Sequence, residues 1–582
     1  MQKPVLMFVA SLLGLSLSGC ANLMDSPPSD SPTEETAVST TAPTTIPEPV
    51  YGDFEPEELY LLLAAEVAAQ RGRYDVTLVN YLKAAQLSRD SGIIERALRI
   101  AQSLNGDNAQ QQLATLWLET DPDNLEAHRV LAIQAVKRNQ LETALSHMEQ
   151  IMDLGADADF DNLAALAAQL DPQQQEELLE LYDQLASRHP GNLEIEYSIA
   201  LLMKINNQPA TALERLEPLL EEHPNFQPAL ILKGDLLYQT GLKTKALDHL
   251  LLNTRRFPDN RQMGTLYGRM LINEGELQAA QDEFGRLMEQ FKDVPGLRLS
   301  HALVALENGE IDIAREDLSR LIEQGHHTDE AHFYLGKIAD GEQRYQQAIG
   351  FYEQVEQGNH YFPALSRASA LQAELGDIES ALGNIRKLRD ANPQQAENFW
   401  LLEINLLLEH HRKQDALAAA NDALTTLPDS IRVRYARAML LDTLERAADA
   451  EADLRHVLDQ EPDNAVALNA LGYILTTRTD RLDEAETLIR HALELDPDNP
   501  AILDSMGWVL FQQGRPLDAL EYLQAAYREF PDPEVAAHYG ELLWQIGEQE
   551  QARVVWRKAL EDNLEHPILR ETILRLTGEQ DL

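Results

Sequence analysis

The sequence predicts an all-α fold, a solenoid of about 14 or 15 stacked helix pairs, on the basis of three repeating features. The first is a series of prolines whose neighbours are 34 or 35 residues apart, with one longer gap. These prolines are Pro190, Pro224, Pro258, Pro393, Pro428, Pro462, Pro497 and Pro531. Proline cannot continue a helix, so each one marks the end of a unit. A period of about 34 residues leaves room for two antiparallel helices and their turns.

The second and third features are small residues at fixed positions within the units. An alanine stands twelve residues before seven of the prolines, at Ala212, Ala246, Ala381, Ala416, Ala450, Ala485 and Ala519. Glycine recurs in the first helix, at Gly234, Gly268, Gly336, Gly472, Gly507 and Gly540. We expect these residues to let the two helices of a unit approach to about 8 Å, because a larger side chain would overpack the contact.

The segments around three of these glycines carry a family resemblance. They read Phe333-Tyr-Leu-Gly-Lys-Ile-Ala, Asn469-Ala-Leu-Gly-Tyr-Ile-Leu and Asp504-Ser-Met-Gly-Trp-Val-Leu, with an apolar residue before the glycine. This pattern resembles the tetratricopeptide repeat and covers nearly all of Glu55 to Leu576. It weakens between Asn105 and Pro122 and between Asp157 and Pro190, where we expect a bend. The predicted domains are divergent repeats at 55–190, the main array at 191–566, and a capping helix with a tail at 567–582.

The N-terminal segment has the layout of an export signal. Lys3 precedes a short apolar stretch, and the run Leu17-Ser18-Gly19-Cys20 resembles the lipobox of bacterial lipoproteins. Residues 1–19 are therefore predicted to be a lipoprotein signal peptide, and Cys20, the only cysteine of the 582 residues, to carry the lipid. Residues 20–54 are rich in Pro, Ser, Thr and acids, which predicts a disordered tether. Ala21 follows the cysteine, and the resemblance then implies an outer-membrane protein that faces the periplasm.

Charge and motif content exclude several classes of function. The chain has 96 acidic and 48 basic residues, a net charge of -48, so its surface repels nucleic acid. The adjacent histidines at His326-His327 and His410-His411 point about 100° apart on a helix and are poor joint metal ligands. The mature chain contains no hydrolase, metalloprotease or phosphate-binding motif. We expect no enzyme activity, no metal and no cofactor.

The resemblance also implies a binding groove lined by the first helix of each pair. Residues three before, one after and four after the small position face this groove in the family. In the C-terminal repeats these are Tyr435, Asn469, Tyr473, Asp504, Trp508, Phe511, Glu541 and Trp544. Aromatic residues among carboxylates and amides fit an extended peptide or a partner helix. The alternative is that these aromatics pack between neighbouring repeats.

The central repeats place more polar residues at the same positions. Arg269, Phe333, Lys337 and Asn405 form a partly basic wall in an acidic chain. This wall could receive an acidic segment or a C-terminal carboxylate. The Lys and Asn pairing with which chaperone-binding relatives hold a carboxylate is absent, so binding of a chaperone tail is not expected.

Anchor, tether and repeat array together resemble envelope lipoproteins that act as docking platforms. The layout is similar to that of tetratricopeptide lipoproteins that bind a periplasmic carboxyl-terminal processing protease and deliver cell-wall hydrolases to it. The resemblance implies an adaptor that raises the effective concentration of substrate at the protease. An assembly factor for a pilus, secretion or cell-wall synthesis machine is a second hypothesis, and an enzyme is a third from a different class.

Overall fold

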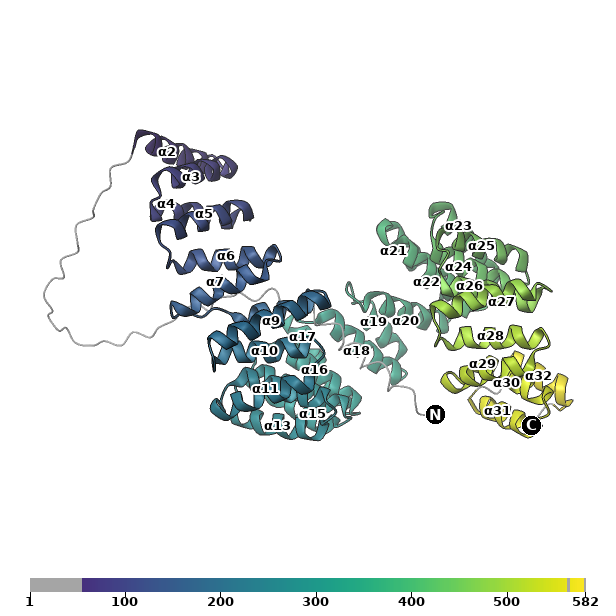
Figure 1. The fold of residues 1–582 in the computed structure, drawn as a ribbon. Helices are drawn as coiled ribbons and strands as arrows, with labels where there is room; N and C mark the ends of the chain where they lie inside the picture. The colour runs from purple at the N-terminus through teal and green to yellow at the C-terminus, as the bar shows by residue number, and fades with distance from the viewer. Residues whose placement is uncertain (1–54, 563–565, 580–582) are drawn as a thin grey trace. The chain divides into compact units, whose positions relative to one another are not determined.

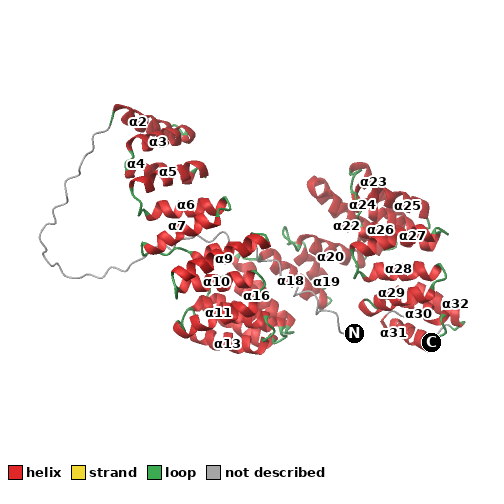
Figure 2. Cartoon of the chain, viewed as in Figure 1, coloured by secondary structure: helices red, strands yellow, loops and turns green. Residues whose placement is uncertain are grey.

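The computed structural model describes residues 55–562 and 566–579, and these residues are organised as helices joined by short turns (Figures 1 and 2). The chain divides into two compact units, one ending at Asp317 and the other beginning at Leu318. Cys20 and the predicted signal and tether at 1–54 lie outside the described residues. None of the described helices combines the length and the apolar character needed to cross a bilayer.

The helices of the first unit follow one another as adjacent pairs. Their bounds are α2 (Pro56–Gln70), α3 (Tyr74–Ser88), α4 (Ser91–Ser103), α5 (Asp107–Thr120), α6 (Leu125–Lys137), α7 (Leu141–Asp153), α8 (Phe160–Leu166), the 3-10 helix η1 (Ala167–Gln169), α9 (Pro172–Arg188), α10 (Leu193–Ile205), α11 (Pro209–Glu222), α12 (Gln227–Gln239), α13 (Lys243–Arg256), α14 (Arg261–Asn273), α15 (Leu277–Gln290), α16 (Pro295–Glu307) and α17 (Ile311–Gln324), which crosses the unit boundary.

The second unit continues the pattern. Its helices are α18 (Thr328–Gly341), α19 (Tyr345–Tyr352), α20 (Tyr361–Glu374), α21 (Ile378–Ala391), η2 (Pro393–Gln395), α22 (Ala396–Glu409), α23 (Lys413–Thr426), α24 (Ile431–Thr443), α25 (Ala447–Gln460), α26 (Ala465–Arg478), α27 (Leu482–Leu495), α28 (Pro500–Gln512), α29 (Pro516–Glu529), α30 (Pro533–Gln545), α31 (Gln549–Asp562) and α32 (Pro567–Thr577). Pairing the helices from α2 to α31 gives fifteen pairs before the single helix α32. The predicted helix-pair fold is confirmed.

The ends of the helices follow from the residues at the turns. Each of the periodic prolines lies just after the second helix of a pair, as Pro258 does after α13 and Pro462 after α25. An asparagine two residues later caps the next helix: the Asn260 side chain accepts a hydrogen bond from the Met263 amide at 2.8 Å, and Asn464 accepts one from Ala467 at 2.9 Å. The sequence Pro-Asp-Asn thus stops one helix and starts the next.

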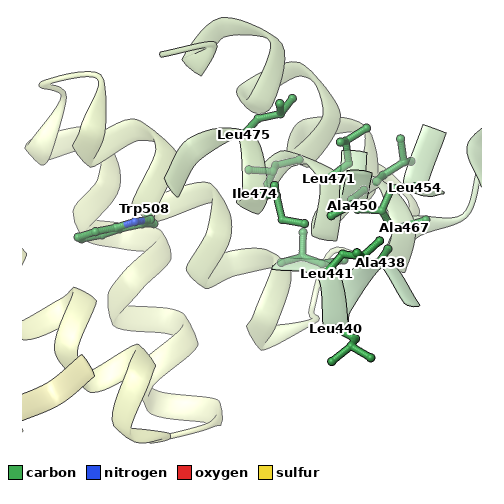
Figure 3. Packing of buried hydrophobic residues seen from close by; sticks show 14 of the residues in the cluster. Ala438, Leu440, Leu441, Ala450, Leu454, Ala467, Leu471, Ile474, Leu475 and Trp508 are labelled. Carbon is green, nitrogen blue, oxygen red and sulfur yellow. The ribbon is translucent and has the colours of Figure 1, made fainter. Parts of the chain in front are cut away.

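The glycine positions are tight contacts within a pair, as predicted. A Cβ added to Gly507 on α28 would lie 2.5 Å from Cγ of Leu523 on α29, and one added to Gly336 would lie 2.6 Å from the Tyr352 ring. The seven periodic alanines are all fully buried. Figure 3 shows this core in the second unit, where Ala450 and Leu454 of α25 pack beside Leu471 of α26.

The pair at 157–190 departs from the pattern. Its first helix, α8, is only seven residues long and continues into η1, whereas α9 has seventeen residues. The long helix begins at Pro172, and the preceding Asp171 caps it by accepting a hydrogen bond from the Gln174 amide at 2.9 Å. Both α8 and α9 pack against α10. The irregular sequence of this stretch therefore produces an irregular pair, and the hydroxyl of the buried Tyr182 ties its two helices by donating to the Phe160 carbonyl at 2.6 Å.

Candidate protein-binding surface

The first helices α18, α20, α22, α24, α26, α28 and α30 carry the candidate surface of the second unit, and each contacts the next along this series or the second helix between them. We call the positions three before, one after and four after the small residue the first-helix face. Tyr435, Tyr473, Trp508 and Trp544 hold these positions. The close contacts at Gly472, Gly507 and Gly540 support the register for the last three of them. The environments of the four side chains differ greatly along the series.

On α28 the first-helix face is filled by side chains of the next repeat. His538 of α30 stacks on the Trp508 indole with ring centroids 4.0 Å apart, and Trp508 stacks in turn on Phe511 at 5.2 Å. Nδ1 of His538 donates to the two carboxylate oxygens of Asp504 at 3.1 and 2.9 Å. All four side chains are buried, with 9% of Trp508 exposed. These residues form what we call the 504–538 cluster.

A longer connection closes the same region. The Tyr473 hydroxyl on α26 donates to Oε1 of Glu534 at the start of α30, at 2.5 Å. This hydrogen bond links two first helices that are separated in the chain by the pair α28 and α29. Burial, followed by the charge of Glu534, raises the pKa of Tyr473 well above its ordinary value, so the phenol stays a donor. Burial alone would lower the pKa of His538, but the charge and hydrogen bond of Asp504 outweigh it and raise that pKa.

The 504–538 cluster makes the predicted anchors part of the protein's own packing. Asp504, Trp508 and Phe511 come together as expected, but His538 and Glu534 occupy the space that a ligand would need. Sequence reasoning missed these two residues. A usable signal exists for His538, because it follows the acidic Asp504 by one repeat period and stands one step from the predicted face.

The remaining C-terminal residues differ in exposure. Trp544 on α30 is half-buried, lies 5.8 Å from the Trp556 ring and has the Arg553 guanidinium 5.5 Å from its centroid. Glu541 is buried and accepts from Arg575 of α32 at 2.6 Å. Asn469 is half-buried, and its Oδ1 finds no hydrogen-bond partner among the described residues.

Towards the middle of the second unit the first-helix face is open. Tyr435 on α24 is half-buried, and burial raises the pKa of its hydroxyl. Asn405 on α22 is exposed. The helices α22 and α24 are in contact. Asn405 and Tyr435 thus place polar groups on two neighbouring first helices.

Aromatic rings and a lysine gather where α18 meets α20. Phe333 stacks on His360 with centroids 4.3 Å apart, and Tyr334 meets the same imidazole edge-on at 5.5 Å. Nζ of the exposed Lys337 lies 6.0 Å from the Phe333 ring and 5.8 Å from the Tyr334 ring. Among the described residues, Lys337 forms no ion pair. The ammonium group of Lys337 is thus exposed beside the half-buried rings of Phe333 and Tyr334.

Arg269 belongs to the first unit and is described there alone. It lies on α14 next to Gly268, whose added Cβ would meet the Phe284 ring at 2.8 Å, and its side chain is exposed. In the part of the chain that the structure describes, no group of three or more His, Cys, Asp or Glu side chains is arranged to hold a metal ion.

Comparison with known proteins identifies the same repeats. A family model described as "Tetratricopeptide repeat" matches residues 205–261, 299–360, 435–500 and 505–563. The TPR repeat-containing protein PA4667 of Pseudomonas aeruginosa is 39% identical over 581 residues, which cover 100% of this chain and 97% of that protein.

Two solved structures match parts of this chain at low TM-scores. A tetratricopeptide repeat protein from Parabacteroides merdae is 17% identical, with a TM-score of 0.34, and the match covers 43% of this chain and 99% of that one. A TPR protein from Thermus thermophilus is 19% identical, with a TM-score of 0.28, over 30% of this chain and 96% of that one.

Proposed function

Because the chain belongs to the tetratricopeptide repeat family, we propose that it is a lipid-anchored adaptor that joins a periplasmic carboxyl-terminal processing protease to cell-wall hydrolases. The chain is a protein-interaction scaffold. Its helices bury their apolar faces against each other and leave polar and aromatic side chains along the first helices.

The observation that carries the proposal is the open stretch of the first-helix face from α18 to α24. Phe333, Lys337 and Tyr435 offer contact area and a positive charge, which are the features of residues that dominate binding energy at interfaces. An adaptor needs no chemistry of its own, because holding two proteins together raises the rate at which they react. The lipobox-like run at Cys20 supports a location at the membrane.

Reconstitution with the purified protease and one hydrolase substrate tests the proposal. We expect the full chain to accelerate substrate loss, and Phe333→Ala, Lys337→Ala and Tyr435→Ala each to weaken binding by about 1 to 3 kcal/mol, or about five- to 150-fold. Phe530→Ala and Lys387→Ala remove an exposed aromatic and an exposed lysine elsewhere in the unit, and serve as matched controls.

The partners can also be captured directly. Affinity purification from detergent-solubilised envelope is expected to recover a serine protease. Recovery of subunits of a pilus, secretion or cell-wall synthesis machine in its place would favour the assembly-factor hypothesis. Unchanged substrate loss in the reconstituted mixture would remove the adaptor function.

A further inference from the structure

The first described helix, α2, has an apolar face that the other described residues leave largely exposed. Tyr60, Leu63 and Val67 are 69%, 58% and 47% exposed. They line a shallow groove together with Ala64, with Arg71 just after α2, and with Val76 of α3. These exposed side chains are too many and too close together to be isolated surface residues. Such contiguous patches mark interaction sites.

On α6 the same positions are covered, and on α4 the position of Tyr60 is covered, whereas Arg96 in the place of Leu63 is exposed. Counted from the start of the next helix, Tyr60 corresponds to Ile93 on α4 and Ala127 on α6, which are 7% and 0% exposed. Val67 corresponds in the same way to Gln134, whose side chain donates to Oε1 of Gln110 on α5 at 3.1 Å. The second helix of the preceding pair is therefore what occupies this face elsewhere, and the open face of α2 is shaped to receive a helix.

The order of residues along α2 indicates which kind of helix can pack on its exposed face. Glu57, Tyr60, Ala64, Val67 and Arg71 are spaced three and four residues apart, so they form one stripe along the helix. The stripe has an acid at one end, a base at the other and apolar residues between. Glu57 and Arg71 are exposed, and neither forms an ion pair with any described residue.

We propose that this stripe is the contact between two copies of the chain, which pair through α2 in antiparallel orientation. A two-fold axis near Ala64 places Glu57 of each copy opposite Arg71 of the other, because both lie seven residues from the centre. The same axis brings Tyr60 of one copy beside Val67 of its partner. The stripe is thus complementary to itself, as an interface between identical subunits requires.

Cysteine cross-linking of the full chain in detergent tests the geometry. Leu63→Cys and Ala64→Cys place a thiol beside the proposed axis, whereas Val79→Cys, on the 51% exposed Val79 of α3, places it away from the stripe. Under mild oxidation we expect a covalent dimer from at least one of the first two variants, and none from Val79→Cys or the unmodified chain. Equal cross-linking at all sites, or none, would overturn the proposal.

Charge reversal tests whether the second helix is α2 itself. In sedimentation experiments on the full chain, Glu57→Arg and Arg71→Glu should each raise the dimer dissociation constant about tenfold, since each places like charges together at both ends of the contact. The double variant restores opposite charges and should restore the dimer. A dimer indifferent to these changes would overturn the pairing. A Cys20→Ser variant that still floats with lipid vesicles, and that loses this flotation when Tyr60 and Leu63 are replaced, would also overturn the proposal. Lipid would then be what covers this face of α2.

Discussion

Asp504 and His538 stand one repeat apart in the chain, and their side chains hydrogen-bond at 2.9 Å between α28 and α30. Both side chains are buried and the His538 ring stacks on Trp508, so the imidazolium is held by the carboxylate rather than by water. Asp504 belongs to the first-helix face, and His538 stands one residue from it. Their contact therefore uses a position that elsewhere in the unit remains open to a partner.

The His538 contact predicts a pH dependence of stability in the second unit. The pKa of His538 is raised in the folded chain, so its contribution is fully present below the unfolded value of about 6.5 and is lost as pH rises through the folded value. Denaturant unfolding at a series of pH values should show the gap between wild type and His538→Gln shrinking as pH increases. His456→Gln, which changes an exposed imidazole on α25, is the matched control variant. A constant gap would mean that the pKa of His538 does not change on folding, which would contradict this prediction.

Trp508→Ala should reduce stability more than affinity. The side chain is buried and stacked on His538 and Phe511, so its removal leaves a cavity that costs about 3 to 5 kcal/mol. Circular dichroism melts and binding measurements on the same variant separate the two effects. A folded, equally stable Trp508→Ala variant that has lost partner binding would return this residue to the binding surface.

Two glycine substitutions test the packing register. Gly507→Ala should destabilise the second unit by about 1 to 3 kcal/mol, because the new Cβ meets Leu523 at 2.5 Å. Gly383→Ala on α21 meets nothing within 4 Å and should stabilise by up to about 1 kcal/mol through helix propensity. Thermal melts of both variants give the comparison. Equal effects at the two sites would contradict the close approach of α28 and α29.

The anchor prediction concerns Cys20 alone. Cys20→Ser removes the only thiol to which a lipid could be attached, so incorporation of labelled fatty acid and flotation with membranes should both be lost. Continued labelling and flotation of this variant would rule out the lipoprotein hypothesis.

The helix pairs could be predicted because a packing requirement leaves a local trace in the sequence. Gly507 and Ala519 are small because α28 and α29 touch there, and Asn464 stands two residues after Pro462 because it caps α26. The environment of Trp508 leaves no such trace. Whether His538 reaches it depends on the rotation between adjacent repeats, which is set by many contacts at once. The short α8 shows the same limit, since the weak pattern indicates irregularity without its form.

The hydrogen bond from Tyr473 to Glu534 has a consequence for how the C-terminal repeats come apart. In a simple linear array each pair interacts only with its neighbours, so the last pair frays first and the others follow one at a time. Here α26 is tied to α30 across a whole pair, and Arg575 of α32 is bound to Glu541. We therefore expect the end of the array to unfold in one cooperative step that includes three pairs and the last helix. Under a pulling force, this part of the chain should unfold in a single event rather than one pair at a time.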